Sequence, residues 1–138
     1  MDQTEQLLKE ITEAGGVPGY EGDVRAVMRR ALEGVAQIEQ DKMGSFIGRH
    51  QGSSERPRVM LAGHMDEIGF MVTLLSKEGF VKFVPLGGWW DQVLLGHRVT
   101  VKTAGGDIVG VLGAKPPHLL DADALKKVVE KKDMYIDV

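Results

Sequence analysis

The sequence contains no cysteine, no long apolar run and no excess of basic residues. Without cysteine, a disulfide framework, a thiolate nucleophile and a zinc-thiolate site are all excluded, so a metal site here must use histidine and carboxylate side chains. No stretch approaches the roughly 20 apolar residues of a membrane span, and the acidic N-terminal residues are unlike a signal peptide. We therefore expect a cytoplasmic protein.

The charge balance is slightly acidic, with a formal net charge of −3. Such a chain has no basic footprint, so we expect neither nucleic acid nor a membrane surface as a partner. Hydrophobic residues make up 43% and charged residues 27% of the 138 positions, which is a globular balance. A chain of this length is long enough for one ordinary domain with a buried core.

Helical periodicity dominates the first part of the chain. Asp2 followed by Glu5 has the form of a capping box, and apolar residues then recur at helical spacing as far as a helix end at Gly15–Gly16. A second apolar stripe predicts a helix over residues 24–35. We interpret the arginines on the other face of that helix as solvated residues without a functional role.

Strands are predicted next. Two short ones, over residues 38–42 and 45–50, turn at Met43–Gly44. The run Val59–Gly63 then has five apolar or small residues without polar interruption, which is typical of a strand buried on both faces, although periodicity alone also allows a buried helix turn. We predict a strand, and with it the start of an α/β sheet domain.

His64 and Asp66 directly follow this run. Binding and catalytic sites of open α/β sheets lie just beyond the carboxyl ends of the strands. Side chains at positions i and i+2 of an extended chain point to the same side, so His64 and Asp66 would face one site. A neutral imidazole is a good zinc or cobalt ligand, and a nearby carboxylate can fix its tautomer. An isolated His-x-Asp pair is more often a hydrogen-bonded histidine beside a turn-forming aspartate than a metal site. The residues that flank the pair are therefore needed to distinguish these two interpretations.

From Glu67 onward the helical period disappears, and short alternating strands with glycine turns follow. Such hairpins usually close into a small barrel. A helix with Leu125, Val128 and Val129 on its apolar side is predicted from Asp121, and a strand from Met134. The sequence stops within that strand without a turn or cap, so we expect a truncated chain. The expected barrel strands cover residues 68–74, 80–84, 99–102 and 108–112.

The residues around His64 resemble a known family. The run Ala62–Gly69 is similar to the first metal-site motif of the M42 metallo-aminopeptidases, which include glutamyl and deblocking aminopeptidases and the tetrahedral TET peptidases. Some members have been labelled endoglucanases. Members run to well over twice this length and place most of their metal ligands later. Three further stretches agree with the family in the same order: Gly19–Glu21, Leu86–Trp89 and Gly113–Leu119.

The resemblance implies a metal-dependent aminopeptidase that removes N-terminal residues from peptides through a water activated by two divalent ions, zinc or cobalt. It implies that His64 is a metal ligand and that Asp66 is its supporting catalytic carboxylate. The general base and the other ligands have no counterpart in this chain, and Glu67 adjoins the motif without being that base. A fragment with one credible ligand is expected to be inactive alone.

The same resemblance implies an α/β protein of two incomplete domains. Residues 1–67 would begin the catalytic peptidase domain, and residues 68–138 would belong to an inserted small β-barrel that assembles homo-oligomers, either dimers or a dodecamer of dimers.

Two other functions stay open. The chain could be a non-catalytic assembly module, because the barrel of these enzymes mediates subunit contacts. Carbohydrate hydrolysis would need a carboxyl pair across a sugar cleft, and the adjacent Asp66 and Glu67 would point to opposite faces of an extended chain.

The pair Trp89–Trp90 could serve an interface or substrate wall as well as a barrel core or loop anchor. The role of His118 is left open.

Overall fold

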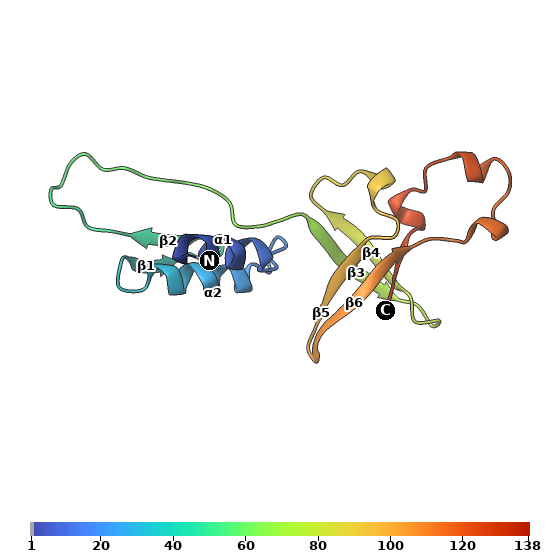
Figure 1. Cartoon of the computed structure of the whole chain (residues 1–138), viewed down its shortest axis with the longest axis horizontal. Coiled ribbons are helices and arrows are strands. Elements are labelled where there is room, and N and C mark those ends of the chain that lie inside the picture. The colour runs from blue at the N-terminus through green and yellow to red at the C-terminus, as the bar shows by residue number, and fades with distance from the viewer. Residues whose placement is uncertain (1) are drawn as a thin grey trace. The chain divides into compact units, whose positions relative to one another are not determined.

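The computed structural model of the chain describes residues 2–138, which form two compact units, one ending at Glu67 and the other beginning at Ile68. Helices and strands together give a mixed α/β fold (Figure 1). No helix in the described residues has the length and apolar character needed to cross a membrane. The elements are α1 (Gln3–Glu13), α2 (Gly22–Leu32), β1 (Gln37–Gln40), β2 (Phe46–Arg49), β3 (Gly69–Leu75), β4 (Val81–Leu86), β5 (Arg98–Thr103), β6 (Gly106–Gly113) and β7 (Tyr135–Asp137).

The first unit begins with the predicted capping box, which is confirmed. The Glu5 N–H donates to the Asp2 carboxylate and the Asp2 N–H donates to the Glu5 carboxylate, both at 2.9 Å, at the start of α1, where the first N–H groups of a helix have no acceptor within the helix. Helix α2 buries Val24 and Val27. An ion pair between Arg30 and Glu10 joins α2 to α1, so this arginine is not simply solvated.

Strands β1 and β2 form the predicted antiparallel hairpin. Gly44 has a φ of +91°, a left-handed conformation that costs glycine little, and this explains the turn between the two strands. The Asp41 carboxylate supports the turn by accepting hydrogen bonds from the N–H groups of Met43 and Ser45.

The prediction of a buried strand at Val59–Gly63 is wrong for the described chain. These residues have no strand conformation, and the exposed fractions of Val59, Met60 and Leu61 are 79%, 87% and 93%. Figure 1 shows the segment between β2 and β3 as a long trace without an arrow. A strand needs a neighbour for its N–H and C=O groups, and no other segment of residues 2–138 pairs with this one. Apolar composition alone indicated the strand.

The second unit is a curled five-stranded sheet in the order β3-β4-β7-β6-β5, with every pair antiparallel. The predicted hairpins β3–β4 and β5–β6 are confirmed, and β7 lies between them. The expected closure into a barrel is not seen in the described residues, where β3 and β5 remain at the two edges.

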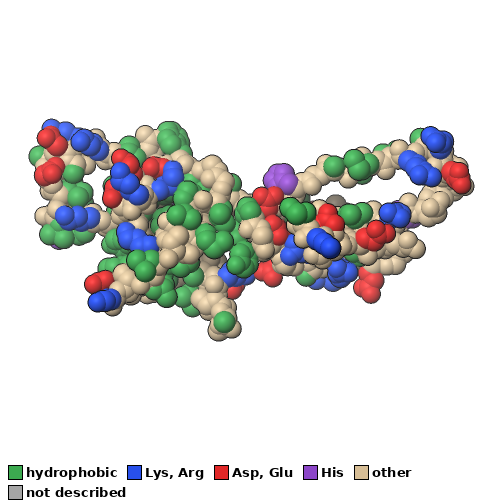
Figure 2. All heavy atoms as spheres, turned by 180° about the vertical axis from the view of Figure 1, so that it is seen from behind, with side chains coloured by type: hydrophobic (Ala, Val, Ile, Leu, Met, Phe, Trp, Pro, Cys, Tyr) green, Lys and Arg blue, Asp and Glu red, His purple; other side chains and the backbone are tan. Residues whose placement is uncertain are grey.

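One face of this sheet packs on a small core. Phe70 contacts Phe83 edge-on at 4.7 Å and stacks on Trp89 at 4.9 Å between ring centroids, which are favourable aromatic geometries. Apolar side chains also remain visible over much of the unit's surface (Figure 2), and Leu74 and Val109 are 60% and 67% exposed. The buried core residues are Val81, Phe83, Leu94, Leu112, Met134 and Ile136.

The predicted helix from Asp121 is wrong. Only a 3-10 turn at Ala124–Lys126 forms, and Lys127 already has extended dihedral angles. Asp121 does accept hydrogen bonds from the N–H groups of Asp123 and Ala124, so it caps a turn as expected of a helix start. A short helix is marginal without a packed apolar face, and Leu125 and Val128 are about half exposed here.

Candidate functional site

The His64 ring is hydrogen-bonded to the residue two positions further along. Its Nδ1 lies 3.0 Å from the backbone oxygen of Asp66 and 3.2 Å from the Asp66 carboxylate. Because both partners are acceptors, this arrangement places a proton on Nδ1, and in the neutral form of the ring Nε2 then keeps its lone pair. The His64 side chain is 85% exposed, so Nε2 is accessible.

The two side chains of the motif therefore meet without the predicted strand. The i, i+2 placement brings the imidazole and the carboxylate within 3.2 Å of each other in a stretch that has no turn or bend. A carboxylate on the non-ligating nitrogen is the arrangement that orients metal-binding histidines and raises their basicity.

Glu67 attaches this segment to the turn that follows α1. Its N–H donates to the Gly16 carbonyl at 2.7 Å, and its carboxylate accepts from the Gly16 N–H at 3.2 Å. Sequence reasoning gave Glu67 no role and treated Gly16 only as a helix end. The contact spans 51 residues of sequence, so no local pattern could have indicated it.

The turn between α1 and α2 contains its own charged contact. The Glu21 carboxylate accepts hydrogen bonds from the Gly19 N–H at 2.6 Å and from Arg25 at 3.0 Å. Hydrogen bonds from the Gly19 N–H, from the backbone N–H of Glu21 itself and from Arg25, in that order, lower the pKa of Glu21 below its ordinary value. This carboxylate is thus engaged in holding the turn that carries Gly16.

His64 fits one position of a metal site, but the described residues do not complete the site. Within residues 2–138, no three side chains of the histidine, aspartate and glutamate types gather closely enough to hold a metal ion. An accessible imidazole nitrogen supported by a carboxylate is suitable chemistry for a zinc or cobalt ligand. The other ligands of such a site are not brought together here.

The remaining histidines have other surroundings. His50 Nδ1 lies 2.6 Å from the Val35 carbonyl, which ties β2 to the residues before β1. His97 forms backbone hydrogen bonds with Leu94 and Leu112 at the start of β5. His118 is exposed in the 3-10 turn Pro117–Leu119. These contacts give His50 and His97 structural roles and leave neither of them near His64 in a metal-binding group within residues 2–138.

The two tryptophans have different environments. Trp89 stacks on Phe70 and donates its indole N–H to the Gly69 carbonyl at 3.0 Å, so it anchors a loop to the core of the second unit. Trp90 is 68% exposed. Of the two possibilities left open by the sequence, loop anchoring therefore applies to Trp89.

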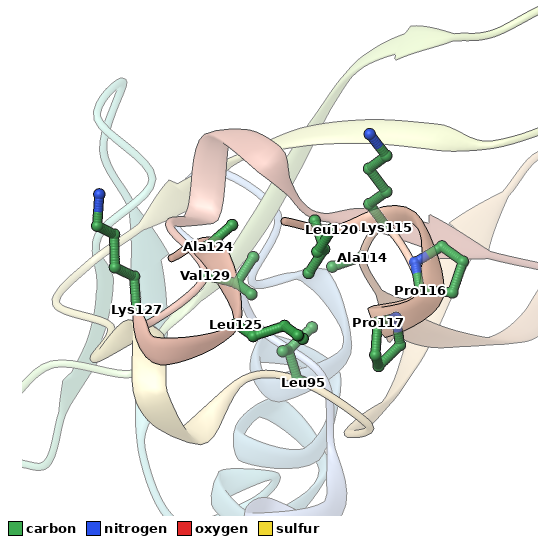
Figure 3. Close-up of a pocket in the computed structure, with 10 residues that line it drawn as sticks. All are labelled: Leu95, Ala114, Lys115, Pro116, Pro117, Leu120, Ala124, Leu125, Lys127 and Val129. Atoms are coloured by element: carbon green, nitrogen blue, oxygen red, sulfur yellow. The ribbon is translucent and has the colours of Figure 1, made fainter. Parts of the chain in front are cut away.

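The second unit also has a shallow hollow of about 290 Å³ under the segment between β6 and β7. Figure 3 shows apolar side chains, among them Leu95, Leu125 and Val129, around a common space, while Lys115 and Lys127 extend away from it. No histidine or carboxylate lines this hollow, so the candidate site is the His64 segment of the first unit.

Comparison with known proteins places this site in a family. The model of the M42 glutamyl aminopeptidase family matches residues 44–138, and a second family model, AMPT, matches residues 2–28. The chain belongs to the M42 glutamyl aminopeptidase family.

Curated relatives differ in their named specificity. The chain is 40% identical over 116 residues to a lysyl aminopeptidase of Pyrococcus furiosus, covering 83% of this chain and 33% of the relative. It is also 40% identical over 116 residues to a glutamyl aminopeptidase of Lactococcus lactis, covering 82% of this chain and 33% of the relative. The chain therefore spans about a third of the length of these relatives.

Solved structures agree with the fold over almost the whole chain. A TET aminopeptidase from a marine sediment archaeon matches with a TM-score of 0.94 and 46% identity, over 99% of this chain and 39% of that one. The Pyrococcus horikoshii TET1 peptidase, described as assembling into a tetrahedron or a large octahedral shell, matches with a TM-score of 0.83 and 35% identity, over 99% and 40%. A Thermotoga maritima structure described as an endoglucanase matches with a TM-score of 0.71 and 34% identity, over 94% and 43%.

Proposed function

We propose that this chain supplies the first metal-site motif of a metal-dependent aminopeptidase that removes N-terminal residues from peptides. The observation that carries the proposal is the His64 ring, whose Nδ1 is held by Asp66 and whose Nε2 is free. Membership of the M42 family and the aminopeptidase names of the relatives support it. The chain spans about a third of the length of those relatives, and we propose that further residues of a complete enzyme would provide the other ligands and the general base.

Within that enzyme the roles of the two residues follow from their contacts. His64 would hold a divalent metal ion through Nε2, and Asp66 would keep the ring in the required tautomer and orientation. When bound, two zinc or cobalt ions would polarise the scissile carbonyl and make hydroxide available near neutral pH. Asp66 would also offset the positive charge that the imidazole would gain if its other nitrogen held a cation.

The proposal is tested in the complete enzyme by the substitution His64→Ala, with metal content and aminopeptidase activity measured together. We expect the variant to lose at least one bound metal ion and its turnover, because the metal site would lack one of its protein ligands. His50→Ala is the matched control, since that ring binds a backbone carbonyl in the same unit. Full metal content and turnover after His64→Ala would contradict the assignment.

The two units are proposed to belong to different domains of that enzyme. Residues 1–67 would begin the catalytic α/β domain, and residues 68–138 would belong to the inserted β-barrel domain through which homo-oligomers assemble. Exposed apolar side chains on the second unit, such as Leu74 and Val109, support an assembly role, either alongside catalysis or as a non-catalytic module. Dimers or larger shells would be seen by light scattering coupled to gel filtration.

Glycoside hydrolysis is less well supported than peptide hydrolysis. It would require two carboxyl groups facing each other across a sugar-binding cleft. Here the Asp66 carboxylate contacts His64, whereas the Glu67 carboxylate is bonded to Gly16. Peptides therefore remain the substrates that we propose. The cytoplasm is the location that we propose for the enzyme.

A further inference from the structure

A single peptide group connects His64 to Gly16. The carbonyl of the bond between Asp66 and Glu67 lies 3.0 Å from His64 Nδ1, and the N–H of the same bond donates to the Gly16 carbonyl at 2.7 Å. The N–H and C=O of a trans peptide point in opposite directions. Gly16 and His64 thus hold this peptide from its two sides.

We infer that Gly16 and Glu67 form a positioning clasp for His64. The N–H and carboxylate of Glu67 anchor the peptide to Gly16, and the carbonyl of that peptide then sets the imidazole ring with Nε2 directed to solvent. The inference rests on the proposed function for the purpose of that free nitrogen. The clasp itself is a property of the metal-free chain.

Gly16 is a rigid point of attachment. It is buried, and a Cβ added to it would lie 2.8 Å from Cγ2 of Val24 and 3.4 Å from the Met65 carbonyl. Val24 is itself only 4% exposed in α2, so it has little room to move. The close approach of the Met65 backbone to Gly16 therefore lets the packed helix pair fix the path of the His64 segment.

The contacts of Glu67 distinguish positioning from catalysis. Its Oε1 accepts the Gly16 N–H, and its main chain returns a second hydrogen bond to the same residue. Two hydrogen bonds to one residue restrict both the peptide orientation and the side-chain rotamer. Glu67 acts on His64 only through the peptide that it shares with Asp66.

The experiment compares Glu67→Ala and Glu67→Gln in the 138-residue chain without metal. The protonation of each histidine ring nitrogen is read from long-range ¹H–¹⁵N spectra at about pH 8, where an imidazole of ordinary pKa is neutral. His50, whose Nδ1 is hydrogen-bonded to the Val35 carbonyl, is an internal reference for a ring whose tautomer is set by a hydrogen bond. His118, which is exposed and whose side chain makes no hydrogen bond within residues 2–138, is the reference for a ring that no hydrogen bond orients.

We expect His64 of the unsubstituted chain to carry its proton on Nδ1, and Glu67→Ala to shift its tautomer populations toward those of His118. Amide exchange at Gly16 and residue 67 should then accelerate by about tenfold, the factor that corresponds to one hydrogen bond. Glu67→Gln should keep the unsubstituted pattern, because its amide oxygen still accepts from Gly16. Glu39→Ala, which removes an exposed partner of Arg49, is the control and should change neither quantity.

Three results would overturn the inference: an unrestrained His64 in the unsubstituted chain, an unchanged His64 in Glu67→Ala, or equal losses in Glu67→Ala and Glu67→Gln. The first result is independent of any variant's ability to fold. The test contains neither metal nor substrate, so its failure is distinct from failure of the proposed function, which is read from His64→Ala in the complete enzyme.

Discussion

Lys131 and Asp91 hold the end of the segment between β6 and β7 against the rest of the second unit. The Lys131 ammonium donates to the Asp91 carboxylate and to the Trp89 carbonyl, and the Lys131 backbone N–H donates to the same carboxylate at 3.1 Å. Both side chains are only about a quarter exposed. The contact therefore joins a charged pair to the loop that carries the stacked Trp89.

This contact predicts a specific pH dependence. The hydrogen bond from Lys131 holds the pKa of Asp91 below its ordinary value. Because the folded pKa is lower than the unfolded one, the stabilising contribution is complete above about pH 3.9, the usual unfolded value, and is lost as the pH falls through the folded pKa. Asp91→Asn should lower the melting temperature at neutral pH, with a difference that shrinks below about pH 3.

Thermal unfolding followed by tryptophan fluorescence, at neutral pH and below about pH 3, tests this prediction. Asp107→Asn is the control, because Asp107 and Lys102 form a pair in which both side chains are about half exposed. Such surface pairs contribute little to stability. A deficit of Asp91→Asn that is equal at both pH values would contradict the prediction.

Gly16→Ala should destabilise the first unit, which contains α1 and α2. The new Cβ would meet Val24 at 2.8 Å, and overpacking of this kind costs about 1–3 kcal/mol. Gly22→Ala is the matched control, since a Cβ there meets no atom within 4 Å and alanine favours the helix. Urea unfolding followed by circular dichroism of the helices compares the two, and equal stability of both variants would show that Gly16 is not tightly packed.

The segment before His64 should be open to proteolysis in the 138-residue chain. Residues 51–64 are exposed and have no helix or strand. Trypsin is expected to cut after Arg58 before it cuts at the arginines of α2, which lie in a helix that a protease must first unfold. Mass spectrometry of the first products identifies the site. Initial cleavage within α2 would contradict the exposed conformation of this segment.

Asp66→Asn should weaken metal binding in the complete enzyme without removing a ligand. Loss of a carboxylate that orients a metal-binding histidine typically costs about 10–100-fold in metal affinity or activity. Calorimetric titration with zinc measures the affinity, and an affinity within twofold of the unsubstituted enzyme would show that Asp66 does not support His64.

Local patterns in the sequence predicted most of the local structure. The Asp2–Glu5 capping box, the glycine turn at Gly44 and the hairpins of the second unit depend on neighbouring residues, and all of them form. The i, i+2 relation of His64 and Asp66 is equally local, and their side chains do meet.

Features that depend on distant partners were not predictable in the same way. Val59–Leu61 has the composition of a buried strand but no pairing neighbour in residues 2–138, and Leu125 and Val128 stay about half exposed instead of forming the packed apolar face of a helix. The Gly16–Glu67 hydrogen bonds leave no periodic signal because they join residues 51 positions apart. Insertion of β7 between β4 and β6 likewise depends on pairing across the whole unit.

We propose that His64 and Asp66 belong to an aminopeptidase metal site that residues 2–138 do not complete. The most direct measurement compares this chain with the complete enzyme on aminoacyl-p-nitroanilides, with cobalt and with a chelator. We predict chelator-sensitive turnover by the complete enzyme and none above background by the 138-residue chain, because a catalytic zinc normally needs about three protein ligands. Chelator-sensitive turnover by this chain at a rate near that of the complete enzyme would show that residues 1–138 already contain a complete metal site.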